Sequence, residues 1–184
     1  MNTNTVSTGA TTWTLDAAHT NINFSVSHMG IAEVSGTFKQ FDGTVTASKA
    51  DFSDAQIVVT IQAKSINTEN NDRDNHLRSA DFFDAENHPV ITFRSTSVAA
   101  AGAGKLAITG DLTMRGVTKS ITLDAKFKGQ AVNPWGVLVA AFKASAVINR
   151  KEWGLSWNAA LEAGGFLVGE EIELTLNVEM NPAK

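Results

Sequence analysis

The residues with the most potential for chemistry lie in one short polar segment. Asp72, Asp74 and His76 fall within a run that also carries Arg73 and Arg78. Asp72 and His76 are four positions apart, so on a helix they would share one face. Together with Asp74 they could bind a metal ion, or act as acid and base on a small lipid or a phosphate ester. The simpler interpretation is helix capping and surface ion pairs.

The other histidines and the known motifs do not strengthen an enzyme interpretation. His19 and His88 fall at predicted turns, where a local hydrogen bond accounts for them. His28 ends an apolar strand face, and it is either a buried neutral residue with a polar partner or a contact for a ligand head group. The sequence has no cysteine, no Gly-x-Ser-x-Gly, no His-Glu-x-x-His and no P-loop. We therefore expect no catalytic residues, no metal ligands and no cofactor.

Composition narrows the classes of partner. The formal net charge is −4 and the basic residues are scattered, which argues against nucleic acids and against anionic membrane surfaces. No stretch approaches the roughly 18 apolar residues of a transmembrane segment. The first residues lack the basic and apolar regions of a secretory signal. The sequence as it stands predicts a cytoplasmic protein, or a periplasmic or secreted one if a signal has been removed.

Alternation of apolar and polar residues dominates the rest of the chain. The segment 171–180 is the clearest case, with Ile172, Leu174 and Leu176 on one face and polar residues on the other. Similar segments at 13–16, 21–28, 34–45, 55–64, 91–96, 106–114, 121–128 and 138–148 bring the count to eight or nine strands. One dry face on each strand predicts an antiparallel sheet folded on itself, as a sandwich or as a barrel. A closed barrel also removes exposed strand edges.

Three segments fall outside this pattern. Residues 70–80 predict one short helix that is capped by Asn70 or Asn71. Residues 149–165 are rich in Trp and Gly and predict a loop with one helical turn. Residues 1–11 predict a flexible polar tail. No linker or repeat divides the remainder, so residues 12–181 are expected to form a single domain.

The interior of such a barrel is either filled or hollow. Eight strands enclose a space that side chains just fill, or that holds one small ligand. Small residues occupy mid-strand positions on the dry faces, namely Gly110, Ala125, Ala140, Ala144 and Ala146. They would leave a long apolar tunnel, unless phenylalanines on neighbouring strands lean over them and fill it. Composition alone does not separate these two interpretations.

The order of several motifs resembles that of the YceI-like family. They include Trp13-Thr-Leu-Asp-Ala-Ala-His-Thr, Arg73-Asp-Asn-His-Leu-Arg-Ser-Ala-Asp-Phe-Phe-Asp, Ile108-Thr-Gly-Asp-Leu-Thr-Met-Arg-Gly-Val-Thr-Lys and Ile148-Asn-Arg-Lys-Glu-Trp-Gly-Leu-Ser-Trp-Asn. The resemblance extends over about residues 13–180. Departures are few, such as Trp153 where Phe is commoner.

The resemblance implies an all-β fold, a lipocalin-like antiparallel eight-stranded β-barrel with one short helix and an elongated apolar interior. It also implies non-catalytic binding, storage or transport of a long-chain isoprenoid lipid. That polyisoprenoid would be an isoprenoid quinone or a polyprenyl phosphate, and it is the only ligand expected. Many members of the family are exported and dimers occur. Exposed strand surfaces make a homodimer reasonable here.

Inward parity on the predicted strands identifies the residues expected to line the tunnel. They are Phe24, Val26, His28, Phe38, Ile57, Val59, Ile61, Phe93, Ile108, Leu112, Met114, Leu123, Phe142, Ala144, Ile148 and Leu174. Two alternative functions stay open at this point. One is a lipid-responsive sensor or stress-related protein that acts through partners, with Trp135, Trp153 and Trp157 as its contact surface. The other is a hydrolytic enzyme that uses Asp72 and His76.

Overall fold

The computed structural model describes residues 9–184, in which strands predominate. The strands are β1 (Thr11–Leu15), β2 (Asn21–His28), β3 (Ala32–Phe38), β4 (Phe41–Ala47), β5 (Gln56–Gln62), β6 (Ile66–Asn67), β7 (Val90–Ala100), β8 (Lys105–Met114), β9 (Val117–Val132), β10 (Leu138–Asn149) and β11 (Val168–Pro182). The α-helix is α1 (Asn71–Arg78), and the 3₁₀-helices are η1 (Ala63–Ser65) and η2 (Arg150–Trp153). Most of the predicted tail, residues 1–8, lies outside the described residues, and β1 already begins at Thr11.

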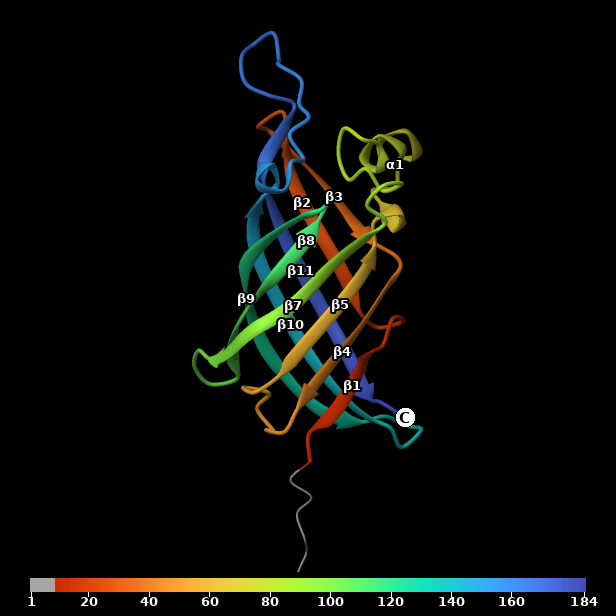
Figure 1. The fold of residues 1–184 in the computed structure, drawn as a ribbon, viewed down its shortest axis with the longest axis vertical. Coiled ribbons are helices and arrows are strands. Elements are labelled where there is room, and N and C mark those ends of the chain that lie inside the picture. Colours follow the sequence, from red (N-terminus) through yellow and green to blue (C-terminus); the bar gives the residue numbers. More distant parts are fainter. Residues whose placement is uncertain (1–8) are drawn as a thin grey trace, which may run out of the picture.

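The sheet closes into an eight-stranded antiparallel barrel (Figure 1). The closed circuit runs β1-β4-β5-β7-β8-β9-β10-β11 and returns to β1, where Leu15 lies opposite Met180. Every pairing in this circuit is antiparallel. The predicted barrel is therefore confirmed, and the sandwich alternative is wrong.

Three strands extend the barrel upward beyond this circuit, as it is oriented in Figure 1. The long strand β11 pairs with β1 at its C-terminal end and with β2 along its N-terminal part. Strand β2 then pairs with β3, and β3 with the short β6. The segment 34–45, predicted as one strand, is thus two. The chain bends between them because Lys39 and Gln40 donate their backbone N–H groups to Ser65 instead of to a neighbouring strand.

Alternating side chains divide the barrel into a dry inside and a wet outside. On β8, Leu106, Ile108 and Leu112 are buried, whereas Lys105 before them and Asp111 between Ile108 and Leu112 face solvent. This period-two pattern follows from the pleat of a strand, and burial of the apolar set fixes the register. The small residues Ala140 and Ala144 of β10 are buried on the same inner side.

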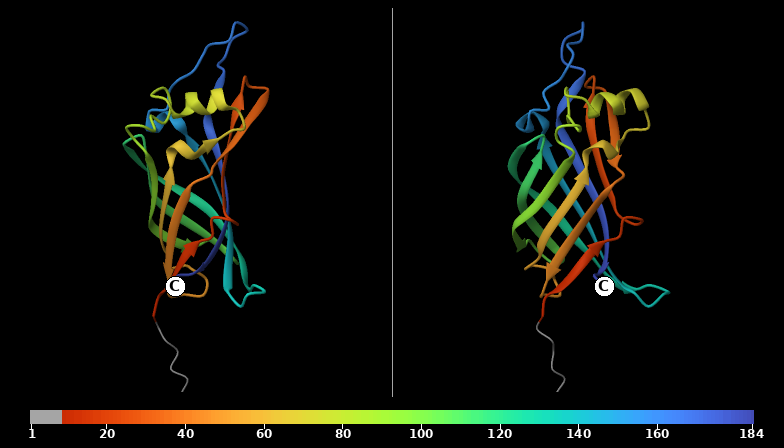
Figure 2. Two further views of the ribbon diagram at one scale, coloured as in Figure 1. Left: turned by 90° about the vertical axis from the view of Figure 1, so that its right-hand side faces the viewer. Right: turned by 45° about the vertical axis from the view of Figure 1, so that its right-hand side comes forward.

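The helix α1 forms one cap at the upper end of the barrel (Figure 2). Its N-cap is Asn70, whose side chain accepts a hydrogen bond from the Arg73 backbone N–H. Buried Asp74 accepts hydrogen bonds from both the backbone N–H and the hydroxyl of Thr68. Arg78 donates to the carbonyl oxygen of Ile66. The helix and its predicted cap are confirmed, and these charged residues fasten it to β6.

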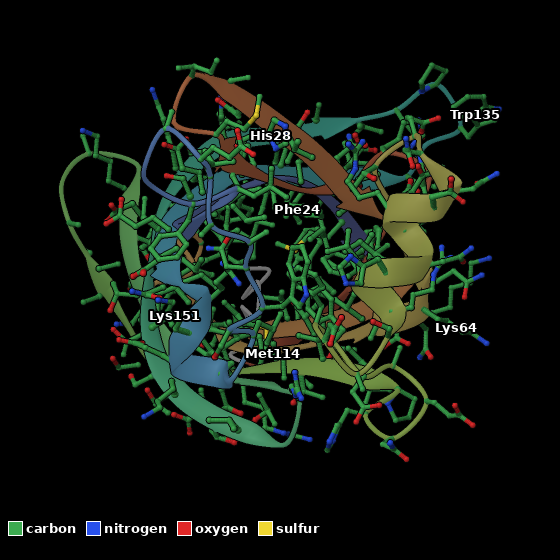
Figure 3. The ribbon with its side chains drawn as sticks, turned by 90° about the horizontal axis from the view of Figure 1, so that it is seen from above. Phe24, His28, Lys64, Met114, Trp135 and Lys151 are labelled. Carbon is green, nitrogen blue, oxygen red and sulfur yellow. The ribbon has the colours of Figure 1, made fainter. Side chains whose placement is uncertain are left out.

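A second cap follows β10 and consists of η2 and the loop up to β11 (Figure 3). Trp153 is buried beneath it, and its indole N–H donates to the carbonyl oxygen of Leu112 at 3.0 Å. The two caps meet, because the Trp157 and His76 rings pack edge to face with centroids 4.5 Å apart. Within residues 9–184, no helix is long and apolar enough to cross a membrane.

Candidate ligand-binding cavity

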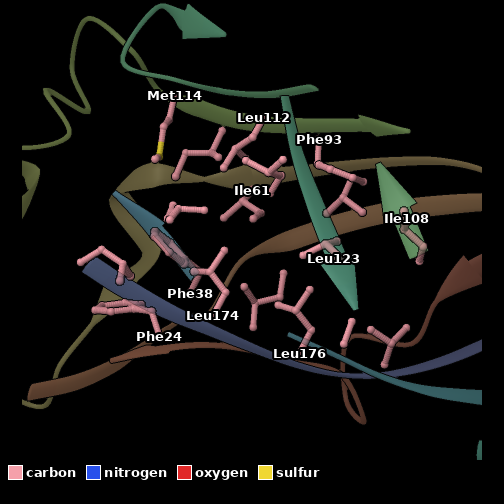
Figure 4. A pocket seen from close by; sticks show the side chains of 18 of the residues that line it. Phe24, Phe38, Ile61, Phe93, Ile108, Leu112, Met114, Leu123, Leu174 and Leu176 are labelled. Atoms are coloured by element: carbon pink, nitrogen blue, oxygen red, sulfur yellow. The ribbon is translucent and has the colours of Figure 1, made fainter. Parts of the chain in front are cut away.

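A cavity of about 250 Å³ runs inside the barrel (Figure 4). Its walls come from every strand of the closed circuit, from β2, β3 and β6, and from both caps. The lining side chains are apolar with two exceptions, Thr20 and Arg150. The Thr20 hydroxyl is already used, because it donates to the Glu179 carbonyl oxygen. The space is therefore suited to an apolar molecule.

All of the predicted lining residues border this cavity except His28. The inward positions of β2 before it, Ile22, Phe24 and Val26, do line the space. His28 is half-buried at the last position of β2, opposite Val168 and Ala32. The prediction that its side chain lines the cavity is therefore wrong, although its partner on β11, Val168, does line it.

Aromatic rings fill the lower end of the barrel. The rings of Phe52, Phe127 and Phe142 form a triangle with centroids 4.9 to 5.4 Å apart, and Phe52 also contacts Trp13 at 5.6 Å. Such tilted and edge-on pairs are the arrangements that aromatic rings prefer. Each of the two predictions for the interior therefore holds for one part of the barrel. Aromatic rings fill the lower end, and the upper part is open.

Two glycines keep the open part from being filled by phenylalanine. A Cβ atom on Gly110 would lie 2.5 Å from Cζ of Phe93, and one on Gly36 would lie 2.5 Å from Cζ of Phe24. Both distances are far below van der Waals contact, so each ring rests directly on a glycine of the neighbouring strand. The glycines let these rings lie against the wall.

The upper end of the cavity holds the buried guanidinium of Arg150, which is 2% exposed. Its Nε–H donates to the Gly169 carbonyl oxygen at 2.7 Å, and Nη1 donates to those of Leu155 and Trp157 at 2.5 and 2.9 Å. These hydrogen bonds join η2 to the start of β11. Burial lowers the pKa of Arg150, and the charge of nearby Glu170 opposes that effect.

Comparisons with known proteins fit this architecture. The model of the YceI-like domain matches residues 13–180. The chain belongs to the YceI-like family. A UPF0312 protein of Staphylococcus aureus is 37% identical over 172 residues, which cover 93% of this chain and 98% of the relative.

Solved structures show the same YceI-like fold. Burkholderia cenocepacia BcnA superposes with a TM-score of 0.78 at 21% identity, over 90% of this chain and 98% of BcnA. A polyisoprenoid binding domain from Saccharophagus degradans gives a TM-score of 0.69 at 16% identity, over 93% and 98% of the two chains. At these identities the likeness establishes the barrel fold.

The polar segment with catalytic potential has structural contacts in this YceI-like barrel. Asp72 is exposed on α1, whereas Asp74 is buried and bonded to Thr68. His76 pairs with Asp81 at 2.8 Å and not with Asp72. The simpler interpretation, an ion pair, therefore accounts for His76. Asp74 instead makes buried hydrogen bonds that neither interpretation predicted.

A different trio has the spacing of metal ligands among residues 9–184: Asp16, His19 and Glu179, on the outer surface. His19 Nδ1 lies 2.9 Å from an Asp16 carboxylate oxygen, which confirms the predicted turn hydrogen bond. This bond raises the pKa of His19 and lowers that of Asp16. The trio is a surface ion-pair cluster that sequence spacing did not reveal, because Glu179 lies far along the chain.

The three tryptophans proposed as one contact surface are far from forming one. Trp153 is buried, Trp157 packs on His76 in the upper caps, and Trp135 is 84% exposed on the β9–β10 turn, which lies at the lower end (Figure 1). That prediction is wrong because Trp153 is buried, and because Trp135 and Trp157 lie on separate elements at opposite ends of the barrel.

The strand-based prediction missed the lining residues supplied by the caps. Leu77, Phe82 and Phe83 come from α1 and the loop after it, and Leu155 follows η2. Alternation of apolar and polar residues identifies inward-facing positions only on strands, so it could not predict these lining residues in the caps. The pair Phe82-Phe83 in an otherwise polar segment was an available signal. Arg150 could also have been predicted as a lining residue, because it continues the even-numbered inward positions of Ala144, Ala146 and Ile148 on β10.

Proposed function

We propose that this YceI-like protein binds a polyisoprenoid lipid inside its barrel and stores or transports it without chemical change. The apolar cavity of about 250 Å³ enclosed by the closed barrel is the observation that carries this proposal. The family supports it, because one structural relative from Saccharophagus degradans is described as a polyisoprenoid binding domain. An isoprenoid quinone or a polyprenyl phosphate fits the proposal.

The shape of the cavity favours a chain over a compact ligand. Lining residues extend from Leu155 and Val168 under the upper caps to Phe52 and Ala55 near the lower end. Burial of each CH₂ of a ligand contributes about 0.8 kcal/mol. At that value, the burial free energy of a full polyprenyl chain would exceed the largest binding free energies known for non-covalent complexes. The entropy lost on ordering the chain, and the movement of side chains, must therefore offset much of this burial free energy.

A carrier needs no reactive groups in contact with its cargo, and the lining agrees with that. Thr20 and Arg150 are the two polar side chains that border the cavity within the described residues. A guanidinium remains protonated at all ordinary pH values and does not serve as a base. Holding the lipid away from water is thus the role that this wall suits best.

The proposal is tested by titrating the protein with isoprenoid alcohols of increasing length. Geraniol, farnesol and geranylgeraniol should bind with increasing affinity, because each added unit buries more apolar surface. Longer alcohols should gain little more, because the aromatic cluster around Phe52 fills the lower end. An affinity that is absent or independent of length throughout the series would contradict a tunnel for isoprenoid chains.

A further inference from the structure

The charge of Arg150 has no counter-ion in the described part of the chain. No carboxylate of residues 9–184 lies within ion-pair distance of its guanidinium. Glu170, whose charge acts on Arg150, is itself paired with Lys151 at 2.5 Å. The groups that Arg150 does contact are neutral carbonyl oxygens. A buried charge that is solvated by dipoles alone is costly compared with one that meets an opposite charge.

The hydrogen-bonding capacity of Arg150 is also incomplete. A guanidinium carries five N–H donors. Three of them, on Nε and Nη1, make contacts of 2.5 to 2.9 Å with carbonyl oxygens of Gly169, Leu155 and Trp157. Nη2 has one long contact, 3.4 Å to the Val168 carbonyl oxygen. The second N–H of Nη2 has no acceptor among residues 9–184, although the side chain is buried and borders the cavity.

Building on the proposed function, we propose that Arg150 is the head-group site and that it selects lipids ending in an oxyanion, a phosphate or a carboxylate. An oxyanion would supply both the missing counter-charge and the missing acceptor. The Arg150 guanidinium lies 6.0 Å from the ring centroid of Phe82, which also lines the cavity. The head group would therefore lie under the upper caps, with the chain directed down toward Phe142.

Arg150 also has a structural role, because its hydrogen bonds tie η2 to β11. Head-group selectivity separates the two roles, since a purely structural arginine would not distinguish ligands that share one chain. The first test therefore uses the unaltered protein and three ligands with the same chain: geranylgeranyl monophosphate, geranylgeranoic acid and geranylgeraniol. Charge-assisted hydrogen bonds predict that at least one of the anions binds about tenfold or more tightly than the alcohol.

The outcomes of this titration are distinct. Tighter binding of the phosphate alone, or of the carboxylate alone, supports the site and identifies its preferred oxyanion. Equal affinity of all three ligands would overturn the assignment of Arg150 and leave the proposed function intact. If none of the three binds, the proposed function itself fails.

A pair of variants locates the selectivity on Arg150. Arg150→Met should lose the preference for the anion, so that anion and alcohol bind the variant with affinities within about threefold of each other. Arg115→Met is the matched control, because Arg115 donates to the carbonyl oxygens of Phe82 and Gly154 in the same caps but does not border the cavity. A folded Arg150→Met protein that keeps the preference would overturn the proposal. If that variant does not fold, the comparison of ligands on the unaltered protein decides the question.

Discussion

Replacing Ala144 by Trp should block the cavity from within. Ala144 is buried at mid-strand on β10 and borders the open space of about 250 Å³. An indole there would exclude part of the isoprenoid chain. Loss of three buried carbons corresponds to about 2.4 kcal/mol, or roughly a fiftyfold weaker affinity for geranylgeraniol. Fluorescence or calorimetric titration with that alcohol measures the change directly.

The matched control is Ser145→Trp, which adds the same ring to the outer face of the same strand, where the side chain is exposed. Overpacking of Ala144→Trp should cost about 1–3 kcal/mol of stability, so circular dichroism and thermal unfolding must show that the barrel remains folded. If folded Ala144→Trp protein binds geranylgeraniol as tightly as Ser145→Trp protein, the cavity is not the binding site.

Three further predictions concern stability. Gly110→Ala should destabilise the barrel by about 1–3 kcal/mol because its Cβ would lie 2.5 Å from both the Phe93 ring and the Arg94 carbonyl oxygen, and an unchanged denaturation midpoint would show that β7 shifts freely to make room. Asn70→Ala should cost about 1 kcal/mol through the lost cap of α1, measured by urea unfolding; no loss would mean that packing alone holds the helix. His19 has a raised pKa and Asp16 a lowered one, so their pair stabilises the fold fully only above the ordinary value of 3.8 for Asp16 and below that of 6.5 for His19. The melting-temperature difference between unaltered and His19→Gln protein should peak near pH 5 and shrink on either side, and a difference independent of pH would refute the pairing.

The sequence predicted the barrel well because nearly every strand has one face toward an apolar interior. Leu106, Ile108 and Leu112 on β8 follow this rule without exception, so counting alternate residues locates both the strand and its inner face. The division of 34–45 into two strands was missed. A signal for it exists in the sequence, because the large apolar residues change from even numbers at Val34 and Phe38 to odd numbers at Phe41 and Val45.

The cavity was less predictable than the wall around it. Whether phenylalanine fills a barrel depends on where each ring rests, and Phe93 lies over Gly110 only because two strands pair in that register. Phe52 belongs to a connection between strands, so no alternation pointed to its place at the lower end. Long-range register and loop packing decide these features, and local sequence patterns carry little information on either.

Native mass spectrometry of the protein purified from its own organism, followed by organic extraction, tests the central claim most directly. The account predicts a copurifying molecule whose mass matches a polyisoprenoid lipid and whose fragments show isoprene units. Protein that carries no lipid, and that also takes up no added isoprenoid, would contradict the claim that the barrel is a lipid-binding site.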